Sequence, residues 1–199
     1  MISTVNDYCI GQDETRVSLI GFGATAITQI EFGSYATKEE LIKEISSLEL
    51  LSQDFSSRNI TNAFCIAHDL IAASGRWLSA PTYVVFFAFG PDDSRNPPSS
   101  LYIAAASLIE FKVESYLVFV PNHLELDPKF EQDIKVIENA TQGLVYLTND
   151  CWTLSQTTLQ QDVKNNAQLE STCGKSCFAN IALLIDQSTA ISEQDYGEQ

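Results

Sequence analysis

The sequence predicts an α/β fold built on a doubly wound, mostly parallel sheet of six strands, with helices on both faces and one antiparallel edge strand. First, uninterrupted apolar runs at residues 82–89, 116–120 and 180–185 are typical of strands buried on both faces. Second, segments with helical periodicity separate the successive runs. Third, residues 26–32 alternate apolar and polar side chains, as a half-exposed edge strand does.

The last strand, residues 180–186, is predicted to lie at the centre of the sheet, parallel to its neighbours. The rest of the chain looks like a sheet that lacks its middle, and we expect the segments 16–22 and 82–89 to flank the last strand. Ligands of open α/β sheets bind beyond the carboxyl ends of the strands. Asp186 and Ser188, which end this strand, are therefore expected at a binding site.

The other elements follow from local signals in chain order. Residues 1–9 have the spacing of a helix end, and residues 16–22 form a strand joined to 26–32 by a hairpin. The helices are expected to begin at Thr37 with a capping box, near Asn59, at Ser99 or Ser100, and at Asp127 before Pro128. A short strand is expected at 144–147, and a last amphipathic helix near Leu154, Leu159 and Val163.

These elements divide the chain into three parts. Residues 1–166 are expected to form one domain that lacks its first strand, 167–177 a linker, and 178–199 a strand with the start of a helix. The last part completes the sheet or begins a following repeat. A chain of 199 residues with 45% hydrophobic residues is long enough to bury a core of this size.

Composition and charge exclude several classes of partner. The formal net charge is -15, and the 11 basic residues are scattered, which argues against nucleic acid and anionic lipid as partners. No apolar run approaches the roughly 18 residues that a membrane helix needs, so membrane insertion is not expected. The start of the chain shows no signal peptide.

Cysteines and glycosylation patterns point to an oxidising compartment, and we expect a secreted or extracellular protein. Of the five cysteines, Cys151 is expected to pair with Cys173 or Cys177, where the ends of the domain meet. Cys9 and Cys65 are expected to stay apart, because right-handed crossovers place their helices on opposite faces of the sheet. Two tripeptides, at Asn59 and Asn139, match the N-glycosylation pattern.

A dinucleotide-binding enzyme is the main alternative, because residues 21–26, Gly-Phe-Gly-Ala-Thr-Ala, spell G-x-G-x-x-A after a strand. That motif needs a helix directly after the glycines, whose amino terminus faces the pyrophosphate. Here the next residues alternate as a strand, so we interpret the glycines as part of a hairpin. The spelling Cys-Gly-Lys-Ser at 173–176 lacks the upstream glycine of a phosphate loop and is assigned to the linker.

Several local segments together resemble the von Willebrand factor type A (VWA) domain family. They are residues 16–23, the turn at 32–35 before a Lys-Glu-Glu-Leu helix, the Asn-Ile-Thr-Asn-Ala segment at 59–63, and Asp186-Gln187-Ser188-Thr189-Ala190, which is similar to the family's Asp-x-Ser-x-Ser motif. The resemblance covers nearly the whole chain in a shifted order, with the motif strand last. It implies a Rossmann-like fold. The order indicates a circular permutant or a fragment of a tandem VWA array.

The resemblance also implies a metal-ion-dependent adhesion site (MIDAS) at the carboxyl edge of the sheet, which we expect to be degenerate and free of metal. Asp186 and Ser188 match its ligands, whereas Ala190, Arg58 and Phe89 stand where a serine, a threonine and an aspartate are needed. Mg²⁺ requires near-octahedral oxygen coordination, which this set does not supply unless Asp92 or Asp93 folds back. Arg58 is expected to replace the cation by holding Asp186 in two hydrogen bonds.

The function implied by the resemblance is binding of other proteins, in adhesion or in the extracellular matrix, without catalysis or a cofactor. A purely structural spacer in an array is the third alternative beside the enzyme. The last strand can complete the sheet within one molecule or by exchange between two, so a strand-swapped dimer and tandem VWA neighbours are possible partners.

Overall fold

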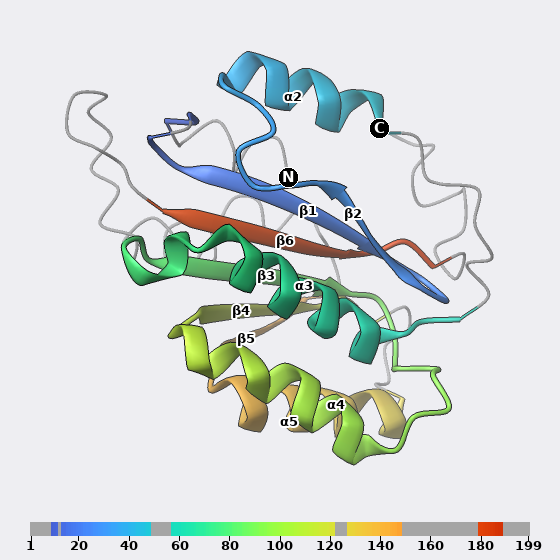
Figure 1. Cartoon of the computed structure of the whole chain (residues 1–199). Helices are drawn as coiled ribbons and strands as arrows, with labels where there is room; N and C mark the ends of the chain where they lie inside the picture. The colour runs from blue at the N-terminus through green and yellow to red at the C-terminus, as the bar shows by residue number, and fades with distance from the viewer. Residues whose placement is uncertain (1–8, 12, 49–56, 122–126, 149–178, 189–199) are drawn as a thin grey trace.

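The computed structural model describes residues 9–11, 13–48, 57–121, 127–148 and 179–188. A six-stranded sheet forms the middle layer, with the strand order β2-β1-β6-β3-β4-β5 (Figure 1). The strands are β1 (Arg16–Phe22), β2 (Ala26–Ile30), β3 (Thr82–Ala88), β4 (Glu114–Phe119), β5 (Leu144–Leu147) and β6 (Asn180–Asp186). Only the β1–β2 pair is antiparallel among these strands, which confirms the predicted fold class.

The strand β6 lies between β1 and β3 and is parallel to both, as predicted. Its register pairs Asn180 with Arg16 on one side and with Thr82 on the other. The burial pattern agrees with this central position in the sheet, because residues 180–184 are all buried. A strand with apolar side chains on both faces is stable only where both faces are covered.

In the described part of the chain, four α-helices and two short 3-10 helices accompany the strands. They are α2 (Lys38–Ser47), α3 (Ile60–Ser74), α4 (Pro98–Ala106) and α5 (Pro128–Thr141), with η1 (Arg76–Leu78) and η2 (Ser107–Phe111). The predicted caps of α2 and α5 are confirmed, because the side chains of Thr37 and Asp127 accept hydrogen bonds from backbone N–H groups. Asn59 caps α3 in the same way.

The predicted start of α4 was wrong. The helix begins at Pro98 with Pro97 as its cap residue, and neither Ser99 nor Ser100 caps it. Proline at the first helical position has its φ angle already set for a helix and lacks the N–H that a cap would satisfy. The proline pair therefore starts the helix one to two residues before the serines.

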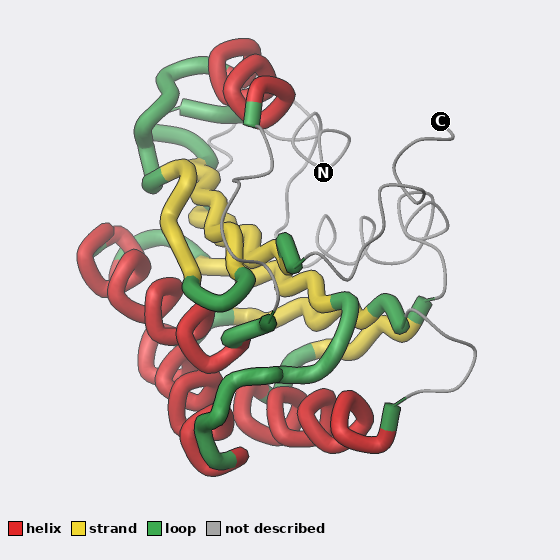
Figure 2. The backbone as a smooth tube through the Cα atoms, turned by 90° about the vertical axis from the view of Figure 1, so that its right-hand side faces the viewer, coloured by secondary structure: helices red, strands yellow, loops and turns green. Residues whose placement is uncertain are grey.

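Alternating residues of each strand divide the core into two clusters, one on each face of the sheet. The helices α3, α4 and α5 pack with one strand face, through residues such as Phe64, Leu101 and Ile134. On the other face, α2 contributes Leu41. Figure 2 shows α2 separated from the other three helices by the sheet.

Several predictions fall on residues outside the described ranges. They include the helix at 1–9 up to residue 8, the helix near Leu154, the linker at 167–177, and Ala190. The disulfide candidates Cys151, Cys173 and Cys177 also lie there. Within the described part of the chain, no helix has the length and apolar character needed to cross a membrane.

Candidate functional site at the carboxyl edge of the sheet

The turn after β1 shows how the sequence builds this edge. Phe22 pairs with Ala26 in the antiparallel β1–β2 hairpin, so no helix follows the glycines at 21 and 23. The turn is tied to its neighbours, since the Asn59 N–H donates to the Gly23 carbonyl over 2.7 Å and the Ala26 N–H donates to Asn62 Oδ1 over 2.7 Å. The dinucleotide motif is therefore a hairpin, as the sequence analysis favoured.

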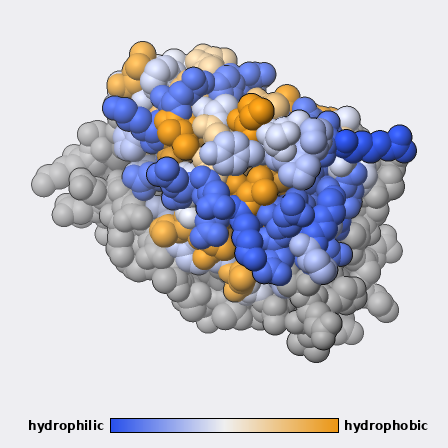
Figure 3. All heavy atoms as spheres, turned by 90° about the horizontal axis from the view of Figure 1, so that it is seen from below, coloured by the Kyte–Doolittle hydropathy of each residue, from blue (hydrophilic) through white to orange (hydrophobic). Residues whose placement is uncertain are grey.

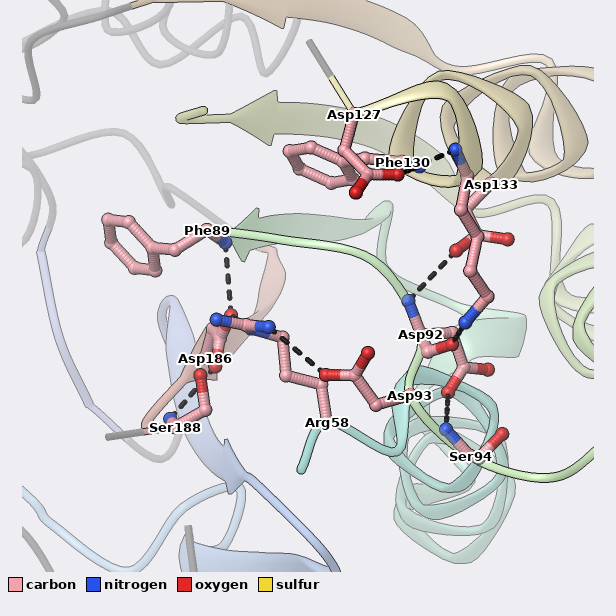
Figure 4. A network of polar contacts seen from close by, with 11 residues as sticks. Arg58, Phe89, Asp92, Asp93, Ser94, Asp127, Phe130, Asp133, Asp186 and Ser188 are labelled. Atoms are coloured by element: carbon pink, nitrogen blue, oxygen red, sulfur yellow. Dashed lines mark hydrogen bonds and ion pairs between the residues drawn. The ribbon is translucent and has the colours of Figure 1, made fainter. Parts of the chain in front are cut away.

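Asp186 ends β6 and is the most deeply buried acidic side chain of this edge, with an exposure of 1%. Its Oδ2 accepts the Arg58 Nε–H over 2.9 Å and the Phe89 N–H over 3.0 Å. Its Oδ1 accepts the Ser188 N–H over 2.9 Å. Three donors from three chain segments thus satisfy one carboxylate (Figure 4). Charge-assisted hydrogen bonds of this kind are the stronger ones in proteins.

Arg58 lies just before α3, and its guanidinium is shared between two carboxylates. The Nη1 atom lies 3.1 Å from Asp93 Oδ2, and the arginine side chain is 8% exposed. We expected the guanidinium to make two hydrogen bonds to Asp186, and this was wrong, because Nε donates to Asp186 whereas Nη1 donates to Asp93. The reason is that the loop after β3 brings Asp93 to the guanidinium, with the Asp93 N–H bonded to the Arg58 carbonyl over 2.8 Å.

Gly90 makes room for this guanidinium. A Cβ atom at Gly90 would lie 2.7 Å from both Cζ and Nη1 of Arg58, closer than non-bonded atoms approach. The glycine follows Phe89, whose N–H binds Asp186, so the backbone of this loop runs directly against the ion pair. A close approach of backbone to a charged group is a common reason for glycine.

A second polar cluster adjoins the first and connects the same loop to α3 and α5. Asp92 is 5% exposed; its Oδ2 accepts the Thr61 hydroxyl over 2.9 Å, and its N–H donates to Asp133 Oδ2 over 2.8 Å. Lys129 donates its ammonium group to the Asp92 carbonyl oxygen. Asp92 and Asp93 thus both fold back to the edge, but each is bound by protein donors.

Burial raises the pKa of Asp133 above its usual range, and the negative charges of Asp92 and Asp93 act in the same direction. The Asp92 N–H and the Lys129 ammonium oppose this shift. Burial is the larger effect, so the charged form of Asp133 is less favoured than that of a solvated aspartate.

Thr61 and Asp133 were missed by the sequence analysis. Thr61 lies in the Asn-Ile-Thr-Asn-Ala segment that was part of the resemblance. We had assigned the family's threonine to the position of Arg58, but it is the Thr61 hydroxyl that lies near this edge, bonded to Asp92. The sequence of this segment could therefore have pointed to Thr61. Asp133 gave no such signal, because an acidic residue within an amphipathic helix is usually solvated, and only the packing of α5 buries it.

The two predicted glycosylation sites differ in exposure. Asn139 is exposed on α5, whereas Asn59 is half-buried and uses its side chain to cap α3. Cys9 directly precedes Ile10, which belongs to the core cluster of the α2 face, while Cys65 lies on α3 on the opposite face. The contacts of Ile10 do not place the Cys9 thiol itself, so its separation from Cys65 stays a prediction.

A cavity of about 340 Å³ lies elsewhere, at the amino ends of β4 and β5, and is lined by Lys112, Ser115 and Gln142 among others. Its walls mix apolar and polar side chains without a charged network that joins several chain segments. The carboxyl edge joins the residues before α3, the loop after β3, the start of α5 and the end of β6. We therefore place the candidate site at the carboxyl edge.

The comparison with protein families agrees with the fold. A family model, that of the von Willebrand factor type A domain, matches residues 1–161. The comparison with curated proteins gave no match. The matched range includes β1 to β5 and ends before β6.

Proposed function

Because this chain belongs to the von Willebrand factor type A domain family, we propose that it is a non-enzymatic module that binds other proteins at the carboxyl edge of its sheet without a bound metal. The observation that carries the proposal is the Arg58–Asp186 ion pair, whose side chains are 8% and 0% exposed. Domains of this family are generally interaction modules. The position of the site after the sheet strands agrees with the general rule for open α/β sheets.

The residues of this edge do not fit a divalent cation. A metal at Asp186 would need its carboxylate oxygens, which already accept three N–H groups, and it would meet the positive charge of Arg58 at hydrogen-bond distance. Phe89 offers no side-chain oxygen. Among the described residues, no group of three or more His, Cys, Asp or Glu side chains is arranged to hold a metal ion. These contacts support the proposal that the edge works without a divalent cation such as Mg²⁺, which needs near-octahedral oxygen coordination.

Thermal unfolding tests the proposal. We expect the same melting temperature, within about 1 °C, in EDTA, in Mg²⁺ and in Mn²⁺, because a ligand stabilises a protein only by binding its native state. The matched control is the Arg58→Ala variant, in which Asp186 and Asp93 lose their cation and metal stabilisation becomes possible. A melting temperature of the unmodified chain that rises with metal concentration would contradict the proposal.

The finer assignments belong to the same proposal. We place the module outside the cell, with Asn139 as the better glycosylation acceptor because it is exposed, and with Cys151 paired to Cys173 or Cys177. Peptide mapping by mass spectrometry before and after reduction tests the pairing. Size-exclusion chromatography with light scattering tests whether β6 is exchanged in a strand-swapped dimer.

A further inference from the structure

The two outer strands of the sheet, β2 and β5, differ in how their free edges are protected. The strand β2 pairs with β1 through a register shift between Leu19 and Ile20, and none of its residues is exposed. Its Gln29 side chain donates to Gln187 Oε1, just after β6. An irregular register and polar side chains are usual means of keeping an edge strand from pairing with other chains.

The strand β5 lacks this protection. It is the last strand in the order of the sheet, next to β4 (Figure 1), and its register with β4 is regular over all four residues. These residues, Leu-Val-Tyr-Leu, include no charged residue and no proline. Leu144 is 49% exposed and Leu147 is 60% exposed. Exposed apolar side chains on an unprotected edge mark a surface where another strand can pair.

The backbone of β5 presents hydrogen-bonding groups along this outer edge. The Thr148 N–H donates to the Phe119 carbonyl oxygen of β4 over 3.1 Å. Because the backbone groups of a strand point alternately to its two sides, those of Val145 and Leu147 face away from β4. Among the described strands, none pairs with this side of β5. The outer edge therefore matches the donors and acceptors of one more extended backbone.

The cavity of about 340 Å³ lies beside the first residue of the same strand. Its apolar walls include Ile109, Val113, Tyr116 and Leu144. Two helix ends form part of its rim, because Lys112 and Gln142 end η2 and α5 in the left-handed conformation, with φ angles of 54° and 55°. The charged residues of the lining, Lys112 and Glu114, have opposite signs, so the cavity does not select a charge. Its volume is at the low end of the roughly 300–1,000 Å³ of ligand pockets, which suits one large apolar side chain.

The net charge of the chain decides between a second copy and another protein as the occupant of this edge. Two copies with a formal charge of -15 each repel one another, and a net charge far from zero keeps proteins monomeric. A neutral or basic strand of another protein meets no such repulsion. On the face seen in Figure 3, the hydrophobic residues among those described appear as separate spots within a largely hydrophilic surface. That face therefore offers no broad apolar area for a different mode of binding.

From these observations we infer that the outer edge of β5 is a second protein-binding site, at which an extended segment of a partner protein adds a strand to the sheet. The partner backbone bonds the outward-facing groups of Val145 and Leu147, and one of its large apolar side chains enters the cavity beside Leu144. In this mode of recognition the main-chain hydrogen bonds give affinity, and the side-chain pocket gives specificity. The site does not involve Arg58 or Asp186, so it goes beyond the function proposed for the carboxyl edge.

Fluorescence anisotropy on the full chain tests this inference with two labelled peptides. One is Lys-Thr-Val-Thr-Phe-Thr-Val-Lys, which is basic and favours an extended conformation, and the other has alanine in place of phenylalanine. The edge variant is Leu147→Pro, which removes an outward N–H but leaves the bonds to β4, as proline does on an edge strand. The matched control is Leu147→Ser, which removes the same exposed side chain and keeps the N–H.

We expect the phenylalanine peptide to bind Leu147→Ser within about threefold of the unmodified chain, and Leu147→Pro at least about tenfold more weakly. The alanine peptide is expected to bind the unmodified chain at least about fivefold more weakly, because it leaves the cavity empty. The inference would be overturned by no saturable binding of the phenylalanine peptide, by equal affinities of the two variants, or by equal affinities of the two peptides.

Hydrogen exchange followed by NMR tests the same site without any substitution. In the unmodified chain, the amides of Val145 and Leu147 are expected to exchange rapidly, and at least about tenfold more slowly once the phenylalanine peptide is bound. Slow exchange in the free chain would show that the edge is already covered and overturn the inference. A dimer in light scattering that Leu147→Pro abolishes would make a second copy the occupant and overturn it as well. Either result would leave the function proposed for the carboxyl edge standing.

Discussion

Two ion-paired residues, one just before α3 and one on it, lie in opposite environments. Arg58, just before the helix, and Asp186 have side-chain exposures of 8% and 0%, whereas His68, in the middle of the helix, is 29% exposed and its partner Glu110 is 59% exposed. Both contacts have short distances, 2.9 Å and 2.6 Å. The two ion pairs therefore do not differ in distance, and their difference in burial decides how much each contributes to stability. Water screens the second pair, while the loss of one partner in the first leaves a charge without solvent.

The largest effect is expected from Arg58→Ala. It leaves Asp186 buried without its cation, and removal of one member of a buried pair destabilises a protein by about 3–5 kcal/mol. Urea unfolding followed by circular dichroism measures the change. The control is Arg95→Ala, an exposed arginine of the neighbouring loop, which is expected to stay within about 0.5 kcal/mol of the unmodified chain. Equal losses from the two variants would remove the distinction between the buried and exposed cations.

Gly90→Ala is expected to have the next largest effect. The added methyl group would meet the Arg58 guanidinium at 2.7 Å, so the ion pair has to shift, at a cost of about 1–3 kcal/mol. A double-mutant cycle separates this clash from any effect on the backbone. In the Arg58→Ala background the same substitution is expected to cost under about 0.5 kcal/mol, since the obstructing group is gone. If Gly90→Ala destabilised the protein equally in both backgrounds, the clash would not be with the Arg58 side chain.

The smallest effect concerns His68 and its dependence on pH. Hydrogen bonding to Asp69 raises the pKa of His68 above its ordinary value, partial burial lowers it, and the hydrogen bond and charge of Glu110 raise it again. A histidine whose folded pKa is raised stabilises the protein below its unfolded pKa, near 6.5, and loses this contribution as pH rises through the folded pKa.

The difference in unfolding free energy between the unmodified chain and His68→Gln should therefore be largest near pH 5.5 and fade above pH 8. Because the pair is exposed, we expect about 0.2–1 kcal/mol at low pH and less in high salt. Urea titrations at four pH values measure it. A difference that grows with pH would mean that the ring acts through packing with Phe111, whose ring centroid lies 5.0 Å away.

The sheet was predictable because its signals are local. An apolar run such as residues 181–185 needs cover on both faces wherever it occurs, so its central place followed from the residues themselves. The caps at Thr37 and Asp127 depend on bonds within one turn and were also predicted. At α4 two local signals competed, and the proline pair determined the start instead of the serines.

The site was predicted only in part, because its bonds join distant segments. The resemblance predicted that Arg58 would contact Asp186, and this contact is present. The sharing of Arg58 with Asp93 depends on how the loop after β3 turns, which no residue pattern specifies. Asp133 is 41 residues from Asp92 in the chain, and nothing in the sequence of α5 distinguishes it from a solvated acid.

The order of the strands has a consequence for the synthesis of the chain. The strand β6 joins β1 on one side to β3 on the other, yet it is translated after every other described strand. Between the end of β5 and the end of β6 the ribosome adds 39 residues, which takes roughly 2–8 s at the usual rates. During that interval β1 and β3 both wait with the edges that will receive β6 unpaired, the state in which strands associate with other chains. This module is therefore expected to depend on chaperones late in translation, and ribosome-bound chains that end before residue 180 should show the strongest chaperone binding.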